Sequence, residues 1–197
     1  MNPVRRLPIV AVIGSGDPDH DNPELAAAVG RLIAEMGFHL LTGGGRGVMS
    51  DACRGFTAVP DRAGLAIGII PRSAAGDEVK AGYPNPWVEL PILTHLAGRL
   101  GPDGEDSRNP INVLTASRIL ALPGGEGTRA EIRLAVRYGK PLLAVTDAAR
   151  EEAGFLGFLR EMRVEHQAVQ REGDGWDLTA VREFLSKEEL GEADRDL

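Results

Sequence analysis

A repeated unit of strand, glycine turn and helix constrains the fold of this chain more than any other feature of its sequence. Short apolar runs end near residues 13, 42 and 122, and each is followed by a glycine-rich turn and then by apolar residues at helical spacing. Such runs are typical of strands that are buried on both faces of a parallel sheet. The alternation therefore predicts an α/β domain in which helices cover both faces of the sheet.

The repeated units form a core from residue 8 to about residue 147. We expect strands over 8–14, 38–42, 64–70, 118–122 and 140–145, and helices over 22–36, over 47–57 and from the 123–127 turn to about 138. This order predicts a Rossmann-like, doubly wound parallel sheet with right-handed crossovers. No composition change marks an internal boundary, so residues 1–197 are expected to form a single domain.

The remaining segments have weaker patterns. Residues 72–110 are rich in proline and predict a long loop near the mouth of the site, with a short extended piece over 87–92. The segment 151–186 predicts two helices, at 155–162 and 178–185. The charged tail, 187–197, is expected to be frayed.

The composition excludes several classes of function. Lys and Arg number 22 against 29 Asp and Glu, a formal net charge of −7, so the chain lacks the positive footprint of a general nucleic-acid binder. Cys53 is the only cysteine, which excludes an intramolecular disulfide and a multi-cysteine zinc site. No apolar run is long enough to cross a bilayer, and the N-terminus lacks a secretory pattern. We therefore expect a cytoplasmic protein without nucleic-acid or membrane partners.

The glycine turns favour an anion site. In open α/β sheets the ligand crevice lies at the carboxyl ends of the strands, where these turns fall. A turn that opens a helix presents unpaired backbone amides at the positive end of the helix dipole, and glycine lets that backbone approach a phosphate closely. We expect a phosphorylated small molecule there, held by Gly14, Ser15, Gly44, Gly45, Gly124, Gly125, Gly127 and Thr128. No metal site is expected, because the histidines lack metal-ligand spacing.

Thr128 and Glu131 allow two interpretations. Thr-x-x-Glu is the pattern of a capping box, in which Thr128 caps a helix and Glu131 bonds back to its amide; spacing alone favours this interpretation. The alternative is functional: Glu131 faces the crevice while Thr128 and the glycine amides hold a phosphate.

Two further groups of charged residues are expected at the surface. Asp17, Asp19 and Asp21 are expected in a solvated turn. Arg129, Arg133 and Arg137 recur every four residues and are expected to face solvent or a second subunit.

Two of the glycine segments also resemble known motifs. Segments 41–49 (LTGGGRGVM) and 123–131 (PGGEGTRAE) resemble the GGG-x-x-G-Φ-M and PGG-x-GT-x-x-E motifs, Φ being apolar, of the LONELY GUY family of cytokinin-activating phosphoribohydrolases. The turn 13–16 (IGSG) fits the same pattern, and the resemblance covers residues 8–147. In that family an arginine, part of an Arg-Lys pair, precedes the PGG proline by fifteen residues; this position is Arg108 here.

The chain departs from that family at two positions. Asn109 replaces the lysine of the pair, and Ser50 replaces the glycine after the methionine. The segment from 108 to 122 resembles more closely a sister group of the same fold, which includes molybdenum-cofactor carrier proteins and uncharacterised nucleotide-binding proteins.

The resemblance implies hydrolysis of the N-glycosidic bond of a nucleoside 5′-monophosphate to free base and ribose 5-phosphate. Glu131 would stabilise the positive sugar and activate water, and Arg108 would pair with Glu131 and fix the substrate. No cofactor would be required, and the resemblance implies a homo-oligomer, either a dimer or a dimer of dimers.

Other functions compete with this hydrolase. The main alternative is a non-catalytic carrier or sensor of the molybdenum cofactor or a nucleotide, which Asn109 favours. Lysine decarboxylation, a label often given to such proteins, is discounted. A pyridoxal-phosphate enzyme needs a Schiff-base lysine in its pocket, and none of the three lysines is expected there. A dehydrogenase is disfavoured because no acidic residue ends the second strand.

Overall fold

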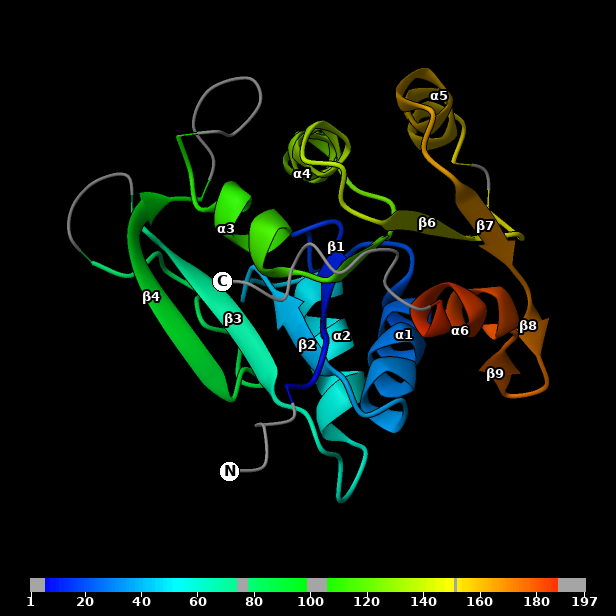
Figure 1. Cartoon of the computed structure of the whole chain (residues 1–197), viewed down its shortest axis with the longest axis horizontal. Helices are drawn as coiled ribbons and strands as arrows, with labels where there is room; N and C mark the ends of the chain where they lie inside the picture. The colour runs from blue at the N-terminus through cyan, green and yellow to red at the C-terminus, as the bar shows by residue number, and fades with distance from the viewer. Residues whose placement is uncertain (1–5, 74–77, 99–105, 151, 188–197) are drawn as a thin grey trace.

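The protein is built on one seven-stranded parallel sheet. Its computed structural model describes residues 6–73, 78–98, 106–150 and 152–187, with the strand order β4-β3-β2-β1-β5-β6-β7 (Figure 1). The strands are β1 (Ile9–Ile13), β2 (His39–Thr42), β3 (Ala66–Arg72), β4 (Leu90–Ala97), β5 (Arg118–Ala121), β6 (Leu142–Asp147) and β7 (His166–Val169). The Rossmann-like α/β prediction is confirmed.

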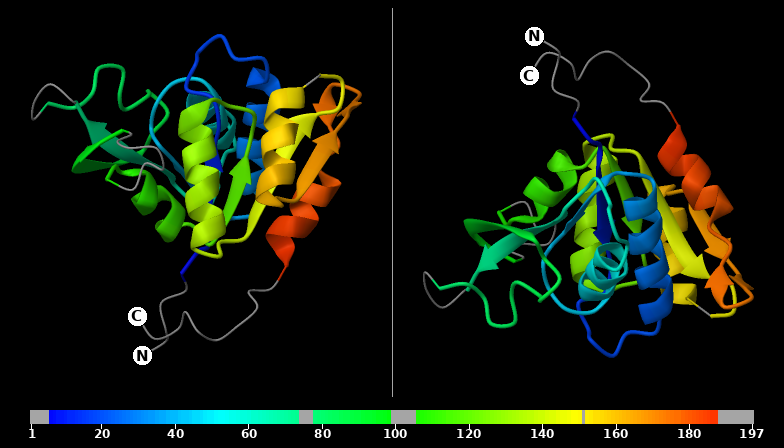
Figure 2. Two further views of the ribbon diagram at one scale, coloured as in Figure 1. Left: turned by 90° about the horizontal axis from the view of Figure 1, so that it is seen from above. Right: turned by 90° about the horizontal axis from the view of Figure 1, so that it is seen from below.

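Helices cover both faces of the sheet (Figure 2). Successive residues of β1 serve opposite faces: Val10 packs in one apolar cluster and Ala11 in the other, as strand geometry requires. The Val10 cluster includes residues of α1 (Pro23–Glu35), α2 (Val48–Thr57) and α6 (Thr179–Ser186). The Ala11 cluster includes residues of α3 (Asn109–Thr115), α4 (Glu126–Arg137) and α5 (Ala153–Met162). No described helix is long and apolar enough to cross a membrane.

Within 72–110, the described residues contain more regular secondary structure than the sequence predicts. The extended piece expected over 87–92 is the eight-residue edge strand β4, over 90–97, and α3 begins at residue 109. Strand β3 continues through Pro71, at a point where its register with β4 shifts. A shift of this kind tolerates a residue that cannot donate a ladder hydrogen bond. Proline content therefore predicted a loop where the chain forms an edge strand.

The C-terminal part contains more than the two helices that the sequence predicts. Helices α5 and α6 match the expected positions. Between them the chain adds β7 and a short antiparallel hairpin of β8 (Arg171–Glu172) and β9 (Gly175–Trp176). The tail predicted to be frayed lies, from residue 188 on, outside the described residues.

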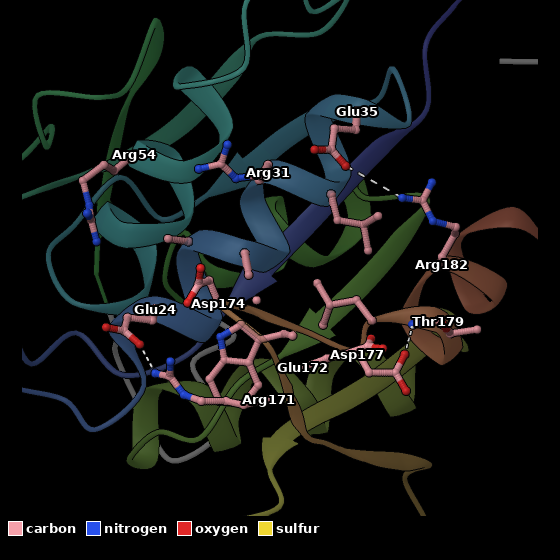
Figure 3. Close-up of a pocket in the computed structure, with 16 residues that line it drawn as sticks. Glu24, Arg31, Glu35, Arg54, Arg171, Glu172, Asp174, Asp177, Thr179 and Arg182 are labelled. Carbon is pink, nitrogen blue, oxygen red and sulfur yellow. Dashed lines mark hydrogen bonds and ion pairs between the residues drawn. The ribbon is translucent and has the colours of Figure 1, made fainter.

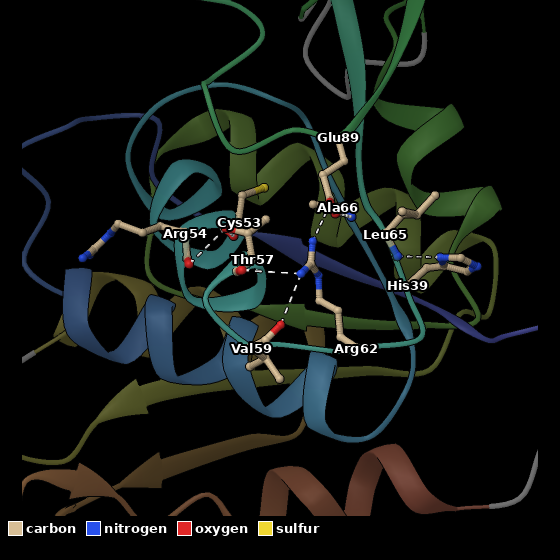
Figure 4. Close-up of polar contacts among 9 residues, drawn as sticks. All are labelled: His39, Cys53, Arg54, Thr57, Val59, Arg62, Leu65, Ala66 and Glu89. Carbon is tan, nitrogen blue, oxygen red and sulfur yellow. Dashed lines mark hydrogen bonds and ion pairs between the residues drawn. The ribbon is translucent and has the colours of Figure 1, made fainter.

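A polar cluster attaches the start of β4 to the end of α2 (Figure 4). Glu89 forms an ion pair with Arg62 and accepts a hydrogen bond from the amide of Ala66 (2.9 Å). Arg62 also donates to the carbonyls of Thr57 (3.4 Å) and Val59 (3.2 Å). The cluster thereby fixes the point at which the chain enters the sheet as β4.

This cluster should make stability depend on pH. Partial burial acts to raise the pKa of Glu89, but hydrogen bonds from Arg62 and Ala66 hold that pKa below its ordinary value of 4.5. A lowered carboxyl pKa stabilises the fold above pH 4.5, and this contribution is lost as the pH falls toward the folded-state pKa. Glu89→Gln should therefore lower the unfolding free energy at pH 7 by about 1 kcal/mol or less.

Urea denaturation at pH 7 and pH 4 measures this effect, with the exposed Glu165→Gln as the control. The difference in unfolding free energy between the wild type and Glu89→Gln should be smaller at pH 4 than at pH 7. An equal difference at both pH values would contradict the lowered pKa of Glu89.

Candidate functional site

Three glycine turns meet at the carboxyl ends of β1, β2 and β5. The amide of Ser15, after β1, donates to the carbonyl of Pro123, after β5 (3.1 Å). The carbonyl of Ser15 accepts from the amide of Val48, the first residue of α2 (2.9 Å). The turn after β1 therefore lies between the other two. The order of strands reverses at β1 and β5, the position at which doubly wound sheets bind ligands.

Close packing explains two of the glycines in these turns. A Cβ atom at Gly14 would lie 2.6 Å from Cγ1 of Val48, and one at Gly124 would lie 2.8 Å from the amide nitrogen of Ser15. Any side chain at either position would separate the turns. By contrast, a Cβ at Gly125 or Gly127 would meet no atom within 4 Å. These two glycines therefore border open space at the start of α4.

Helix α4 begins earlier than the capping-box interpretation requires. Its N-cap is Gly125, and no side chain caps it. Thr128 is consequently inside the first turn, and Glu131 lies a further turn along the helix. No described group accepts a hydrogen bond from the amides of Glu126, Gly127 or Thr128, which is the ordinary condition of a helix start and of an anion site. The capping-box interpretation is wrong.

A cavity of about 330 Å³ opens beside these amides. It is lined by residues that the sequence analysis selected, namely Gly14, Ser15, Arg108, Gly125, Gly127, Thr128 and Glu131. It is also lined by residues that were not selected as site residues: Gly16, Met49, Lys80, Tyr83, Gly98 and Asn109. Segments far apart in the sequence thus converge on one cavity.

Gly44 and Gly45 do not line this cavity. Gly44 has a positive φ of 71°, and its carbonyl accepts from the amide of Asn85 (2.8 Å). The carbonyl of Gly45 accepts from Nδ2 of Asn85 (2.9 Å), and a Cβ at Gly45 would lie 2.6 Å from the hydroxyl of Tyr83. These glycines hold the segment that contributes Tyr83 to the cavity. Gly124, at the turn itself, also lies outside the lining.

Glu131 is buried, with 8% of its surface exposed. Its Oε1 accepts a hydrogen bond from Nδ2 of Asn112 (2.8 Å). Burial raises its pKa, and the positive charge of Arg108 and the hydrogen bond from Asn112 oppose the rise only in part. The expected ion pair is absent, because no described contact within 4 Å joins the side chains of Arg108 and Glu131. Asn112, which the sequence analysis did not select, is the direct partner.

Arg108 is a buried cation with unused hydrogen-bond donors. Only 5% of its surface is exposed, and neither Nε nor Nη1 has a hydrogen-bond partner. Its guanidinium group occupies the place that a side chain at Gly43 would take. Leaving such donors unpaired is costly in a protein interior. These two unpaired nitrogens belong to a side chain that lines the cavity, so the guanidinium group is suited to bind an anionic ligand there.

Lys80 and Tyr83 come from the segment that the sequence analysis treated as a loop. The Lys80 ammonium lies 5.3 Å from the centre of the Tyr83 ring, and both residues line the cavity. The expectation that no lysine reaches the pocket is therefore wrong. No periodic pattern in 72–110 could have selected these residues, because their position depends on the pairing of β3 with β4.

Two of the three arginines of the α4 stripe pack against α5, whereas Arg137 is exposed as expected. The guanidinium groups of Arg129 and Arg133 lie 5.3 and 5.2 Å from the centre of the Phe158 ring in α5. Both arginines also pair with Glu126, at 3.5 and 3.6 Å. These contacts orient α5 against α4 and account for two arginines that were expected to face solvent or a second subunit.

A separate cavity of about 610 Å³ lies between α1, α6 and the β8–β9 hairpin (Figure 3). Two ion pairs lie among its charged side chains: Arg171 with Glu24, and Arg182 with Glu35 at 3.7 Å. Asp177 accepts from the amide of Thr179 (3.0 Å). Because Arg171 and Arg182 are paired within the protein, whereas two nitrogens of Arg108 are not, this cavity is the weaker candidate.

Comparison with known proteins gives the family. The model of the SLOG cluster4 family matches residues 7–172. The chain belongs to the SLOG cluster4 family. A relative from Archaeoglobus fulgidus, an uncharacterized protein, is 32% identical over 135 residues, which are 68% of this chain and 78% of that protein. Membership of the LONELY GUY family itself stays a prediction.

Two solved structures share the fold at higher coverage. The molybdenum cofactor binding protein of Rippkaea orientalis matches with a TM-score of 0.64 and 29% identity, over 84% of this chain and 91% of that chain. The molybdenum cofactor carrier protein of Chlamydomonas reinhardtii matches with a TM-score of 0.64 and 29% identity, over 92% of this chain and 100% of that chain. The expectation that no cofactor is involved is contradicted by these neighbours, whose names give the molybdenum cofactor as a ligand.

Matched glycine substitutions should separate folding from binding. Gly124→Ala should destabilise the protein by about 1–3 kcal/mol, because the new methyl group would overlap Ser15. Gly127→Ala should be neutral or stabilising by up to about 1 kcal/mol, because it adds a methyl group to a helix in open space. It should nevertheless weaken ribose 5-phosphate binding.

Thermal unfolding and isothermal titration calorimetry measure the two effects. Unchanged ribose 5-phosphate binding by Gly127→Ala would contradict an anion site at the start of α4.

The raised pKa of Glu131 predicts a second pH effect. A buried acid with a raised pKa contributes most stability while protonated, and this contribution is lost as the pH rises from 4.5 through the folded-state pKa. Glu131→Gln can still accept the hydrogen bond from Asn112 but carries no charge. Its stability relative to the wild type should therefore increase from pH 4.5 to pH 8 in urea denaturation. A difference that does not change with pH would refute this.

Proposed function

We propose that this protein binds and carries a phosphorylated small molecule of the molybdenum-cofactor type. The observation that carries the proposal is the combination, around one cavity, of unpaired amides at the start of α4 and two unpaired nitrogens on buried Arg108. Both features suit a phosphate in a protein whose net charge is −7. The named ligand of the two solved neighbours supports the same class.

In this proposal the phosphate is held mainly by the backbone. The amides of Gly125, Gly127 and Thr128 would donate to its oxygens, and Ser15 would close one side. Arg108 would supply a fork of charge-assisted hydrogen bonds from the opposite wall. These residues fit a phosphate because a Cβ at Gly125 or Gly127 would meet open space.

A second function, N-glycosidic hydrolysis of a nucleoside monophosphate, is favoured by one observation. Glu131 lines the same cavity as the amides, so its carboxyl group could act on a sugar attached to the phosphate. Two features weigh against it. The raised pKa of Glu131 disfavours the ionised form, and the lysine of the related Arg-Lys pair is Asn109 here. Incubation with adenosine 5′-monophosphate tests hydrolysis directly, since adenine release would favour the hydrolase and its absence the carrier.

The carrier function predicts that the purified protein retains cofactor. Protein purified without air from cells that make the molybdenum cofactor should release a fluorescent pterin after oxidation. Arg108→Gln should reduce the pterin recovered per protein by about tenfold, because it removes the buried cation.

Arg31→Gln is the matched control, because Arg31 is exposed and lines the separate cavity beside α6. Equal pterin recovery from Arg108→Gln and Arg31→Gln would contradict the assignment of Arg108. A homo-oligomer and the lack of nucleic-acid partners stay predictions.

A further inference from the structure

A second cavity adjoins the proposed phosphate site. Its volume is about 420 Å³, and it shares Ser15 and Gly125 with the first cavity. Gly125 and Arg129 line it from one face of α4, whereas Thr128 and Glu131 line the first cavity from another face. At 100° per residue the centres of these two faces are about 110° apart. A phosphate at the start of α4 can therefore carry a substituent into either cavity.

Carboxyl groups dominate the second cavity. It is lined by Asp17, Asp19, Asp21 and Glu152, and its basic lining residues are Arg129 and His20. Asp17 accepts from the amide of Asp19 (3.0 Å), and Asp21 pairs with Arg150 (3.3 Å). The three aspartates are exposed, as expected for a solvated turn, and the turn also forms one wall of the cavity across from the start of α5. Its excess of acceptors suits a ligand group rich in N–H donors.

Asn22 supplies an independent sign of a ligand. It lines the cavity, only 6% of its surface is exposed, and it is the N-cap residue of α1. Its side chain makes no capping hydrogen bond, however, and Oδ1 has no partner at all. The Nδ2 atom instead donates to Oε1 of Glu152 (3.4 Å). An N-cap asparagine ordinarily bonds the helix amides, so here an acceptor is left free beside the cavity.

Neighbouring contacts hold Asn22 in this position. The backbone amide of Asn22 donates a hydrogen bond to Nδ1 of His20 (3.2 Å). Nε2 of the same histidine is hydrogen-bonded to the carboxyl group of Asp51 in α2 (2.9 Å). On the same cavity, Nε of Arg129 is a buried donor without a partner. Two side chains that line the cavity, those of Asn22 and Arg129, therefore each keep one buried polar atom without a partner, and Glu152 lines the same cavity.

We propose that this cavity is a subsite for the 2-amino-4-oxopyrimidine edge of a guanine-type or pterin-type ring. The ring N–H and amino groups donate to Oδ1 of Asn22 and to Glu152, and the ring carbonyl accepts from Nε of Arg129. Two acceptors that meet adjacent N–H and amino groups distinguish this edge from that of adenine, whose ring nitrogen at the same position is an acceptor. The inference rests on the proposed function, because the phosphate of the same ligand occupies the start of α4.

This subsite also gives the direction of the ligand. A ring in the second cavity is directed away from the α4 face that carries Glu131. The protein then binds the ligand without bringing a glycosidic bond to that carboxyl group. Carriage and hydrolysis thus correspond to two different directions from one phosphate.

Calorimetric titration with guanosine, inosine and adenosine 5′-monophosphates tests the subsite. Inosine 5′-monophosphate lacks the 2-amino group and is otherwise matched to the guanosine compound. The guanosine compound should bind about tenfold more tightly than either of the others, as expected for a two-point contact with a base edge. Equal affinities for the three nucleotides would overturn the subsite.

Glu152→Gln tests the residue assignment, with Glu161→Gln in α5 as the matched exposed control. Glu152→Gln should reduce the preference for guanosine over inosine to about twofold or less and leave ribose 5-phosphate affinity unchanged. A preference that survives in Glu152→Gln would overturn the assignment. Failure of the wild type to bind ribose 5-phosphate is a distinguishable result, which would overturn the proposed function and the subsite with it.

Discussion

The close approach of three turns at one sheet edge is the constraint on which the candidate site depends. The hydrogen bond from Ser15 to Pro123 joins the turns after β1 and β5, and the bond from Val48 to Ser15 joins the first turn to α2. A side chain at Gly14 or Gly124 would separate them. Because the turns are close, the start of α4 borders a cavity whose walls come from distant parts of the chain.

An acidic protein can present an anion site because the positive potential is local. The amides at the start of α4 need no compensating charge, and a buried guanidinium group, that of Arg108, lies on the same cavity. Glu131 reduces that positive charge only to the extent that it is ionised, and its burial disfavours ionisation. The electrostatics of this cavity therefore favour a bound anion more than an ionised catalytic carboxylate.

The sequence predicted the central part of the fold because local pattern and topology agree there. The strand–turn–helix units gave β1, β2 and β5 nearly to the residue, and with them Gly14, Ser15, Gly125, Gly127 and Thr128 of the cavity lining. Arg108 and Glu131 were selected through family motifs, and both line the cavity.

The rest of the site could not be predicted because it depends on long-range pairing. Lys80 and Tyr83 reach the cavity only because β3 pairs with an edge strand inside a proline-rich segment. Asn112 is recognisable only once α3 packs on α4. The capping box failed because Thr-x-x-Glu does not show where the helix begins, and the helix begins at Glu126.

The central claim is that main-chain amides at the start of α4 hold a phosphate group. Amide chemical shifts in two-dimensional ¹H–¹⁵N NMR spectra, recorded while ribose 5-phosphate is added, test it most directly. The account predicts that the largest saturable shifts fall on residues 125–128, with smaller ones at Ser15. Shifts centred on α1 and α6 around the separate cavity, with residues 125–128 unmoved, would contradict it.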